Sequence, residues 1–261
     1  MKVFGVDFTC APRRAKPIVV AEGVLRGSNL QLFSIEKLDN FNAFESFLQQ
    51  PGPWIGGFDF PFGLPLELVK DLGWPRQWKP LIRFCDSLSR KELRGILDGY
   101  RATRPVGRKY AHRATDAPAG SSSPMKLVNP PVALMFQEGA PRLLEAGVHI
   151  PGLAEGDRSR VALEAYPGLF ARSVVGRVSY KSDTRAEHTA ARREARVQIL
   201  KNLKVKATRQ LLKQLIEDGS GDALDAAICA WQAAAAWRLR SRNFGLPDTV
   251  APCEGWIIGA R

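Results

Sequence analysis

The chain has 261 residues, 45% of them hydrophobic, and a formal net charge of +12 at pH 7. These values are typical of a globular protein with a sizeable core, and no apolar run approaches the roughly 18 residues of a membrane span. Four widely spaced cysteines without a CxxC pair argue against a zinc site or a disulfide framework, and the first residues do not resemble a signal peptide, so we expect a cytoplasmic protein.

The first sixty residues predict three strands, a helix and a fourth strand. Residues 2–9 alternate in polarity, and residues 16–25 and 30–35 are predicted to form a hairpin. Phenylalanines at helical spacing predict a helix over 40–50, and PWIGGFDF at 53–60 predicts the fourth strand. This order predicts an α/β fold with a mixed sheet of about five strands, in which the first three are antiparallel and helices cover the faces.

A largely helical insertion is predicted at about residues 66–158. It contains a stretch without periodicity at 101–130, and a loop of that length is usually functional or disordered. A helix over 132–146 is predicted to end at Gly147. Because we find no internal repeat and no domain boundary, we expect the whole chain to form a single domain that carries this insertion.

The remaining elements follow the insertion. The sequence predicts a fifth strand at 160–167, helices near 168–175, 185–202, 207–217 and 222–237, and a short last strand at 255–259. The helix at 222–237 is apolar on all sides and is therefore expected to be buried.

The positive charge is concentrated in two segments. Residues 90–113 carry eight basic and two acidic side chains, and residues 181–213 carry ten and three, whereas the rest of the chain is almost neutral. Such a distribution is typical of a protein that binds DNA or RNA, although a solvated helix surface would produce it too. We expect both segments to form one continuous surface. Its predicted contacts with nucleic acid are Arg101, Arg104, Arg108, Lys109, Arg113, Lys181, Arg192, Arg193 and Arg196.

Three acidic residues occupy predicted strands, where carboxylates are unfavourable. Asp7 lies between Val6 and Phe8, Asp59 ends the fourth strand, and Glu164 lies near the end of the fifth. Each has a structural alternative: Asp7 could face solvent, Asp59 could organise the following turn, and Glu164 could pair with an arginine.

Two more carboxylates open the buried helix. Asp222 and Asp225 are three residues apart and therefore lie on one helical face. The simple structural explanation makes Asp222 the N-cap and Asp225 the third helical residue, since acids are favoured at that end. If the first and fourth strands are neighbours, however, Asp7, Asp59, Asp222 and Asp225 converge. Such a group requires a hard cation such as Mg²⁺ or Mn²⁺, and a two-metal carboxylate site cleaves phosphodiesters.

Four motifs carry a resemblance to a known family. GVDFT at the start, GGFDFPFGLP, LEAYP and GDALDAAICAW resemble the predicted-nuclease family called domain of unknown function 429. The resemblance implies a ribonuclease H-like fold. It also implies that Asp7, Asp59, Asp222 and Asp225 are the metal ligands and that Glu164 belongs to the same catalytic set.

These observations lead to a main hypothesis and two alternatives. The main one is a Mg²⁺- or Mn²⁺-dependent nuclease that acts on DNA or RNA by a two-metal carboxylate mechanism. The first alternative is a nucleic-acid-binding protein that has lost catalysis. The second is a hydrolase or transferase that acts on a small phosphorylated molecule.

Overall fold

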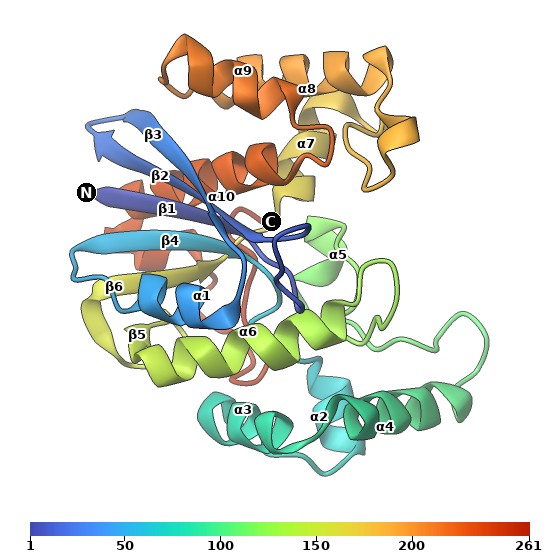
Figure 1. The fold of residues 1–261 in the computed structure, drawn as a ribbon. Coiled ribbons are helices and arrows are strands. Elements are labelled where there is room, and N and C mark those ends of the chain that lie inside the picture. Colours follow the sequence, from blue (N-terminus) through green and yellow to red (C-terminus); the bar gives the residue numbers. More distant parts are fainter.

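Six strands form one mixed sheet in the computed structural model, which describes all 261 residues (Figure 1). The strands are β1 (Lys2–Asp7), β2 (Ile18–Arg26), β3 (Asn29–Leu38), β4 (Trp54–Asp59), β5 (Val148–His149) and β6 (Asp157–Glu164). Their order in the sheet is β3-β2-β1-β4-β6-β5. β2 is antiparallel to both β1 and β3, whereas β4 is parallel to β1 and β6 is parallel to β4. The predicted α/β fold is confirmed, and its mixed sheet agrees with the ribonuclease H-like arrangement.

The parallel pairing of β1 with β4 sets two acidic residues side by side. The register runs from Lys2 opposite Trp54 to Asp7 opposite Asp59, so both strands end at the same level. Every residue of β1 after Lys2 is buried, because helices cover both faces of the sheet (Figure 1). Asp7 and Asp59 therefore lie side by side as the last residues of two strands whose interior residues are apolar and buried.

The helix α10 (Asp222–Arg238) packs directly on the centre of one face. A Cβ atom on Gly5 would lie 1.9 Å from the carbonyl oxygen of Ala226, and one on Gly57 would lie 2.4 Å from that of Cys229. These two glycines, which face each other in β1 and β4, let the alanine-rich helix approach closely. The close approach brings the N-terminus of α10 to the sheet edge that carries Asp7 and Asp59.

The inserted helices share a hydrophobic core with the opposite face of the sheet. They are α2 (Leu66–Asp71), α3 (Trp78–Ser87), α4 (Arg90–Ala102), α5 (Asp116–Ala119) and α6 (Val132–Ala146), and α1 (Phe41–Leu48) precedes them. One cluster of 39 buried residues joins Phe4 and Phe58 of the sheet to Phe44 of α1, Leu81 of α3 and Phe136 of α6. The insertion is therefore packed against the sheet.

The segment predicted to be a long loop at 101–130 is partly ordered by burial. It includes α5, and Ala111, Met125 and Leu127 belong to the core. The predicted helix over 132–146 is confirmed with the same bounds, and Gly147 ends it with a φ of 66°. The two-residue strand β5 was not predicted, because two residues carry no periodic pattern.

The C-terminal third covers the α10 face of the sheet. It contains α7 (Pro167–Val175), η1 (Arg185–Glu187), α8 (Ala190–Leu203), α9 (Arg209–Glu217) and, after α10, η2 (Arg240–Gly245). The strand expected at 255–259 is only a single bridge, between Ile257 and Glu164. None of the helices has both the length and the apolar character that crossing a membrane requires.

The structure corrects the predicted cap of α10. Gly221, with a φ of 79°, is the N-cap, so Asp222 is the first helical residue and Asp225 the fourth. The carboxylate of Asp218 accepts a hydrogen bond of 2.9 Å from the amide of Ala223 and satisfies the start of the helix instead. Asp222 is therefore not the cap, and the helix dipole, which favours acids in the first turn, is what remains of the structural explanation.

Candidate functional site

Four aspartates form a carboxylate cluster at the ends of β1 and β4. The cluster consists of Asp7, Asp59, Asp222 and Asp225, the four residues predicted as metal ligands. Asp7 and Asp59 face each other in the sheet, and α10 supplies the other two from above. The negative charges of Asp222, Asp225 and Asp59 all raise the pKa of Asp7, which places the four carboxylates within electrostatic range of one another.

Burial and mutual repulsion disfavour the ionised cluster. Burial is the largest cause that raises the pKa of Asp7 well above its usual value, and the neighbouring aspartates add to it. Burial raises the pKa of Asp59 to about 7, with Lys181 acting against it. The pKa of Asp225 is also raised by burial, although Lys181 and Tyr180 lower it. The site is therefore short of positive charge.

Two lysines compensate the helix side of the cluster. The ammonium of Lys16 lies 2.9 Å and 3.1 Å from the two carboxyl oxygens of Asp222. Lys181 donates a hydrogen bond to Oδ2 of Asp225, and the hydroxyl of Tyr180 donates to Oδ1 over 2.6 Å. Burial lowers the pKa of Lys181, but Asp225, Tyr180 and Asp7 together raise it well above its usual value. Lys181, which was predicted to contact nucleic acid, thus lies beside the cluster with its side chain 41% exposed.

The strand side of the cluster has no such compensation. No side chain or backbone group donates a hydrogen bond to Asp7 or Asp59, although Asp7 is only 8% exposed. With the lysines in place, no three acidic, histidine or cysteine side chains surround a common point closely enough to hold a metal ion. The donor set itself suits one, because unpaired carboxylate oxygens are the ligands that Mg²⁺ and Mn²⁺ prefer.

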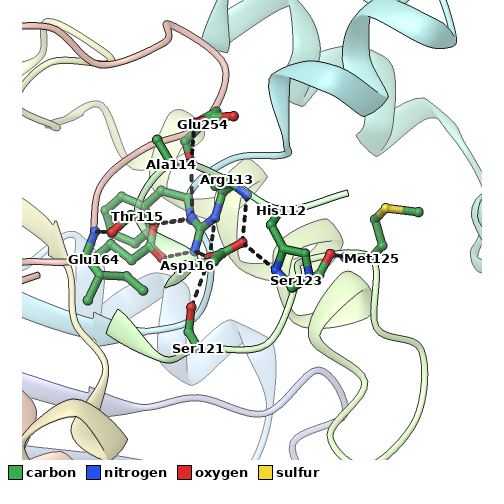
Figure 2. Close-up of polar contacts among 12 residues, drawn as sticks. His112, Arg113, Ala114, Thr115, Asp116, Ser121, Ser123, Met125, Glu164 and Glu254 are labelled. Carbon is green, nitrogen blue, oxygen red and sulfur yellow. Dashed lines mark hydrogen bonds and ion pairs between the residues drawn. The ribbon is translucent and has the colours of Figure 1, made fainter. Parts of the chain in front are cut away.

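Glu164 lies in a different group of charged side chains, the Arg113 network, which consists of Arg113, Asp116, Glu164 and Glu254 (Figure 2). Its Oε1 is 2.7 Å from the guanidinium of Arg113, and its Oε2 accepts from Arg113 over 2.8 Å and from the amide of Phe62 over 2.9 Å. Burial raises the pKa of Glu164, whereas Arg113 and the Phe62 amide lower it. Glu164 was predicted to be catalytic, and the geometry gives it structural partners.

The rest of the Arg113 network connects the insertion with the C-terminal segment. Asp116 accepts from Arg113 over 2.9 Å and from the hydroxyl of Ser121 over 2.9 Å (Figure 2). The carboxylate of Glu254 accepts from the amides of Ala114 and Leu66, over 2.9 Å and 2.7 Å. The network therefore fixes the edge of the sheet beside the carboxylate cluster.

A pocket of about 350 Å³ lies between the two groups of charges. Its lining includes Asp59 of the carboxylate cluster with the neighbouring Lys181, and Arg113 and Glu164 of the Arg113 network. Sequence analysis gave no indication of this pocket, because its walls come from β4, β6, α6, α7 and the loops around them.

The predicted contacts with nucleic acid are distributed over separate parts of the molecule. Figure 1 shows α4, in the segment 90–113, and α8, in the segment 181–213, at opposite ends, although Arg113 and Lys181, one from each segment, line the same pocket. Arg113 and Arg196 are each 3% exposed, which corrects their prediction as surface contacts. Arg196 donates instead to the carbonyl oxygens of Ile216 and Tyr180.

The other predicted basic contacts lie at or near the surface, several of them in ion pairs. Arg104 pairs with Glu67 over 2.6 Å, and Arg101 pairs with Asp98. Arg192 pairs with Glu187 over 2.8 Å and Arg193 with Glu217 over 2.6 Å. Arg108 and Lys109 are exposed. The paired arginines can bind a polyanion only if its phosphates replace their acidic partners.

Comparison with known proteins extends over most of the chain. A family model described as "Protein of unknown function (DUF429)" matches residues 5–249, a range that includes all four aspartates of the carboxylate cluster and Glu164. No curated protein and no solved structure matches the chain.

Proposed function

Because this chain belongs to the DUF429 family of proteins of unknown function, we infer its chemistry from the carboxylate cluster and propose that it is a metal-dependent nuclease. The reaction would be hydrolysis of phosphodiester bonds in DNA or RNA with Mg²⁺ or Mn²⁺. One observation carries the proposal: Asp7 and Asp59 lie level at neighbouring strand ends, without a hydrogen-bond donor, and beside two further carboxylates.

The residues of the cluster have distinct roles in this proposal. Asp7 and Asp59 would hold the ion from the sheet, and Asp222 and Asp225 would hold it from the helix. When bound, the ion supplies an activated water and positive charge at the phosphate. Lys181, whose side chain is 41% exposed, could then leave Asp225 and bind a phosphate oxygen. Burial of the cluster strengthens all of these interactions, since the local dielectric is low.

The experiment that tests the proposal combines metal binding with cleavage. Isothermal titration calorimetry with Mn²⁺ should give binding to the unsubstituted chain and a large loss in Asp7→Asn. Single-stranded and duplex DNA and RNA should be cleaved only with Mg²⁺ or Mn²⁺, and only when Asp7 is present. Asp248→Asn is the matched control, because Asp248 is an exposed aspartate outside the cluster. Cleavage that persists in Asp7→Asn would refute the proposal.

The pocket beside the cluster favours a second candidate, a hydrolase or transferase for a small phosphorylated molecule. Its volume of about 350 Å³ falls within the range of roughly 300–1,000 Å³ for small-molecule sites. Metal-dependent release of phosphate from a mononucleotide or a sugar phosphate, without cleavage of any polynucleotide, would support this candidate.

A further inference from the structure

The pocket is joined to the carboxylate cluster by two shared residues. Asp59 and Lys181 line it at the end where the cluster lies. Lys181 donates to Asp225, and its side chain is 41% exposed, so its ammonium reaches both the cluster and solvent. An anion that enters the pocket at this end would therefore lie beside the carboxylates that the proposed chemistry uses.

Tyr166 and Arg172, whose side chains both carry planar groups, also line the pocket. The guanidinium carbon of Arg172 lies 5.1 Å from the centre of the Tyr166 ring. Arg172 is held there by hydrogen bonds of 3.1 Å to the Tyr166 hydroxyl and 2.6 Å to the carbonyl oxygen of Ala119. Aromatic rings and guanidinium planes are the groups on which unstacked nucleobases pack in proteins.

Apolar side chains complete the lining of the pocket. Met135, Val175 and Val178 line the pocket, and Val178 is 56% exposed. Arg113 and Glu164 also line the pocket, but they add little net charge to it because they form an ion pair with each other. The occupant that fits this lining is a flat, largely apolar ring joined to an anion.

We propose that this pocket binds the base of one unpaired nucleotide, whose phosphate lies toward Asp59 and Lys181. The inference rests on the proposed function, since that phosphate is the one on which the carboxylate cluster acts. A base inside a duplex is stacked and paired, so it must be extruded before it can enter such a pocket. The substrate class is therefore a single strand, a frayed end or a free nucleotide.

The test measures binding in Asp7→Asn without added metal, so that no cleavage interferes. A labelled single strand is titrated by fluorescence anisotropy, and the same strand with one abasic site and the same strand in a duplex are titrated beside it. We expect the intact strand to bind about five- to tenfold more tightly than either, because stacking of a single base contributes a factor of that order. A free nucleoside monophosphate, titrated by calorimetry, distinguishes a free nucleotide from a strand as the source of the base.

Variants of the pocket then decide whether this discrimination arises there. Tyr166→Ala should remove the difference between intact and abasic strands, and Tyr166→Phe should keep it. Val178→Asp should weaken binding about tenfold. The matched control is Val128→Asp, because Val128 is 61% exposed, does not line the pocket and lies outside both basic segments. Val178→Asp also tests the proposal if Tyr166→Ala does not fold.

The outcomes separate this inference from the proposed function. Discrimination against the abasic strand that survives both Tyr166→Ala and Val178→Asp would overturn the pocket, even if metal-dependent cleavage is found. Discrimination that is lost in these variants would support the pocket, even if no metal produces cleavage. Equal binding of intact and abasic strands by Asp7→Asn would directly refute the proposal that the pocket binds a base.

Discussion

The carboxylate cluster and the Arg113 network begin with the same feature of the sequence, an acidic residue at the end of a buried strand. Asp7 and Asp59 end β1 and β4, and Glu164 ends the neighbouring strand β6. In the Arg113 network, the carboxylate of Glu164 accepts hydrogen bonds from Arg113 and from a backbone amide. In the cluster, Asp7 and Asp59 accept none. The two regions thus differ in how their charges are satisfied.

The difference indicates which of two adjacent acidic sites has chemistry available to it. A buried carboxylate with complete hydrogen bonds is already stabilised and gains little from a ligand. A buried carboxylate without donors has lost its hydration and gained no hydrogen bonds in return, and a bound cation can offset this cost. An acidic residue in a strand therefore indicates a functional site only when its carboxylate lacks hydrogen-bond donors.

The largest expected effect tests the structural character of the Arg113 network. Arg113→Met leaves the carboxylates of Asp116 and Glu164 and the carbonyl oxygen of Glu254 buried without their donor, and should lower the free energy of unfolding by about 3–5 kcal/mol. Urea denaturation followed by circular dichroism measures this change. Arg158→Met is the matched control, because the Arg158 side chain is 77% exposed, and it should have almost no effect. A loss below about 1 kcal/mol for Arg113→Met would show that the network does not support the fold.

Asp7→Asn should have the opposite profile. Cleavage should fall at least about 100-fold, since even residues that only support a metal ligand contribute up to about that factor. The free energy of unfolding should stay equal or rise, because the substitution removes one buried charge from a group that repels itself. Activity assays and denaturation of the same preparation measure both. A strongly destabilised Asp7→Asn would place Asp7 with Glu164 among the structural acids.

The carboxylate cluster could be predicted from the sequence because it depends on regular elements. Carboxylates within apolar strands are conspicuous, and parallel strands end at a common edge, so Asp7 and Asp59 follow from the order of strands. The lysines Lys16 and Lys181 could not be predicted, since they reach the cluster from loops whose paths depend on tertiary packing. The pairing of Arg113 with Glu164, 51 residues apart, was unpredictable for the same reason.

The separation of the basic segments also depends on tertiary structure. Sequence shows how much charge each segment carries, but packing decides that α4 and α8 lie over opposite faces of the sheet (Figure 1).

The cap of α10 shows that a prediction from neighbouring residues can also fail. Asp222 matched the N-cap pattern, yet Asp218 forms the capping hydrogen bond because Gly221 adopts a left-handed conformation.

A titration of the free energy of unfolding against pH tests the carboxylate cluster at a single residue, Asp59. Burial raises the pKa of Asp59 from 3.8 to about 7 in the folded chain, so the folded state binds this proton more tightly than the unfolded state. Stability should therefore rise as the pH falls from about 8 to about 4, by up to about 4 kcal/mol from this residue. Asp59→Asn should remove that part of the slope in denaturation curves collected across this range. Asp248→Asn, the exposed control, should keep it.

The smallest expected effect concerns Lys181, whose ammonium occupies the position beside Asp225 that a metal ion would need. The ammonium and the ion compete for the same carboxylate, so Lys181→Met should increase the affinity for Mn²⁺. The increase should be about two- to fivefold, because the Lys181 side chain is 41% exposed and partly exposed ion pairs contribute at most about 1 kcal/mol. Calorimetric titration with Mn²⁺ measures it. Lys201→Met, at an exposed position outside the cluster, should leave the affinity unchanged. Weaker Mn²⁺ binding by Lys181→Met would mean that the lysine positions Asp225 for the ion instead of competing with it.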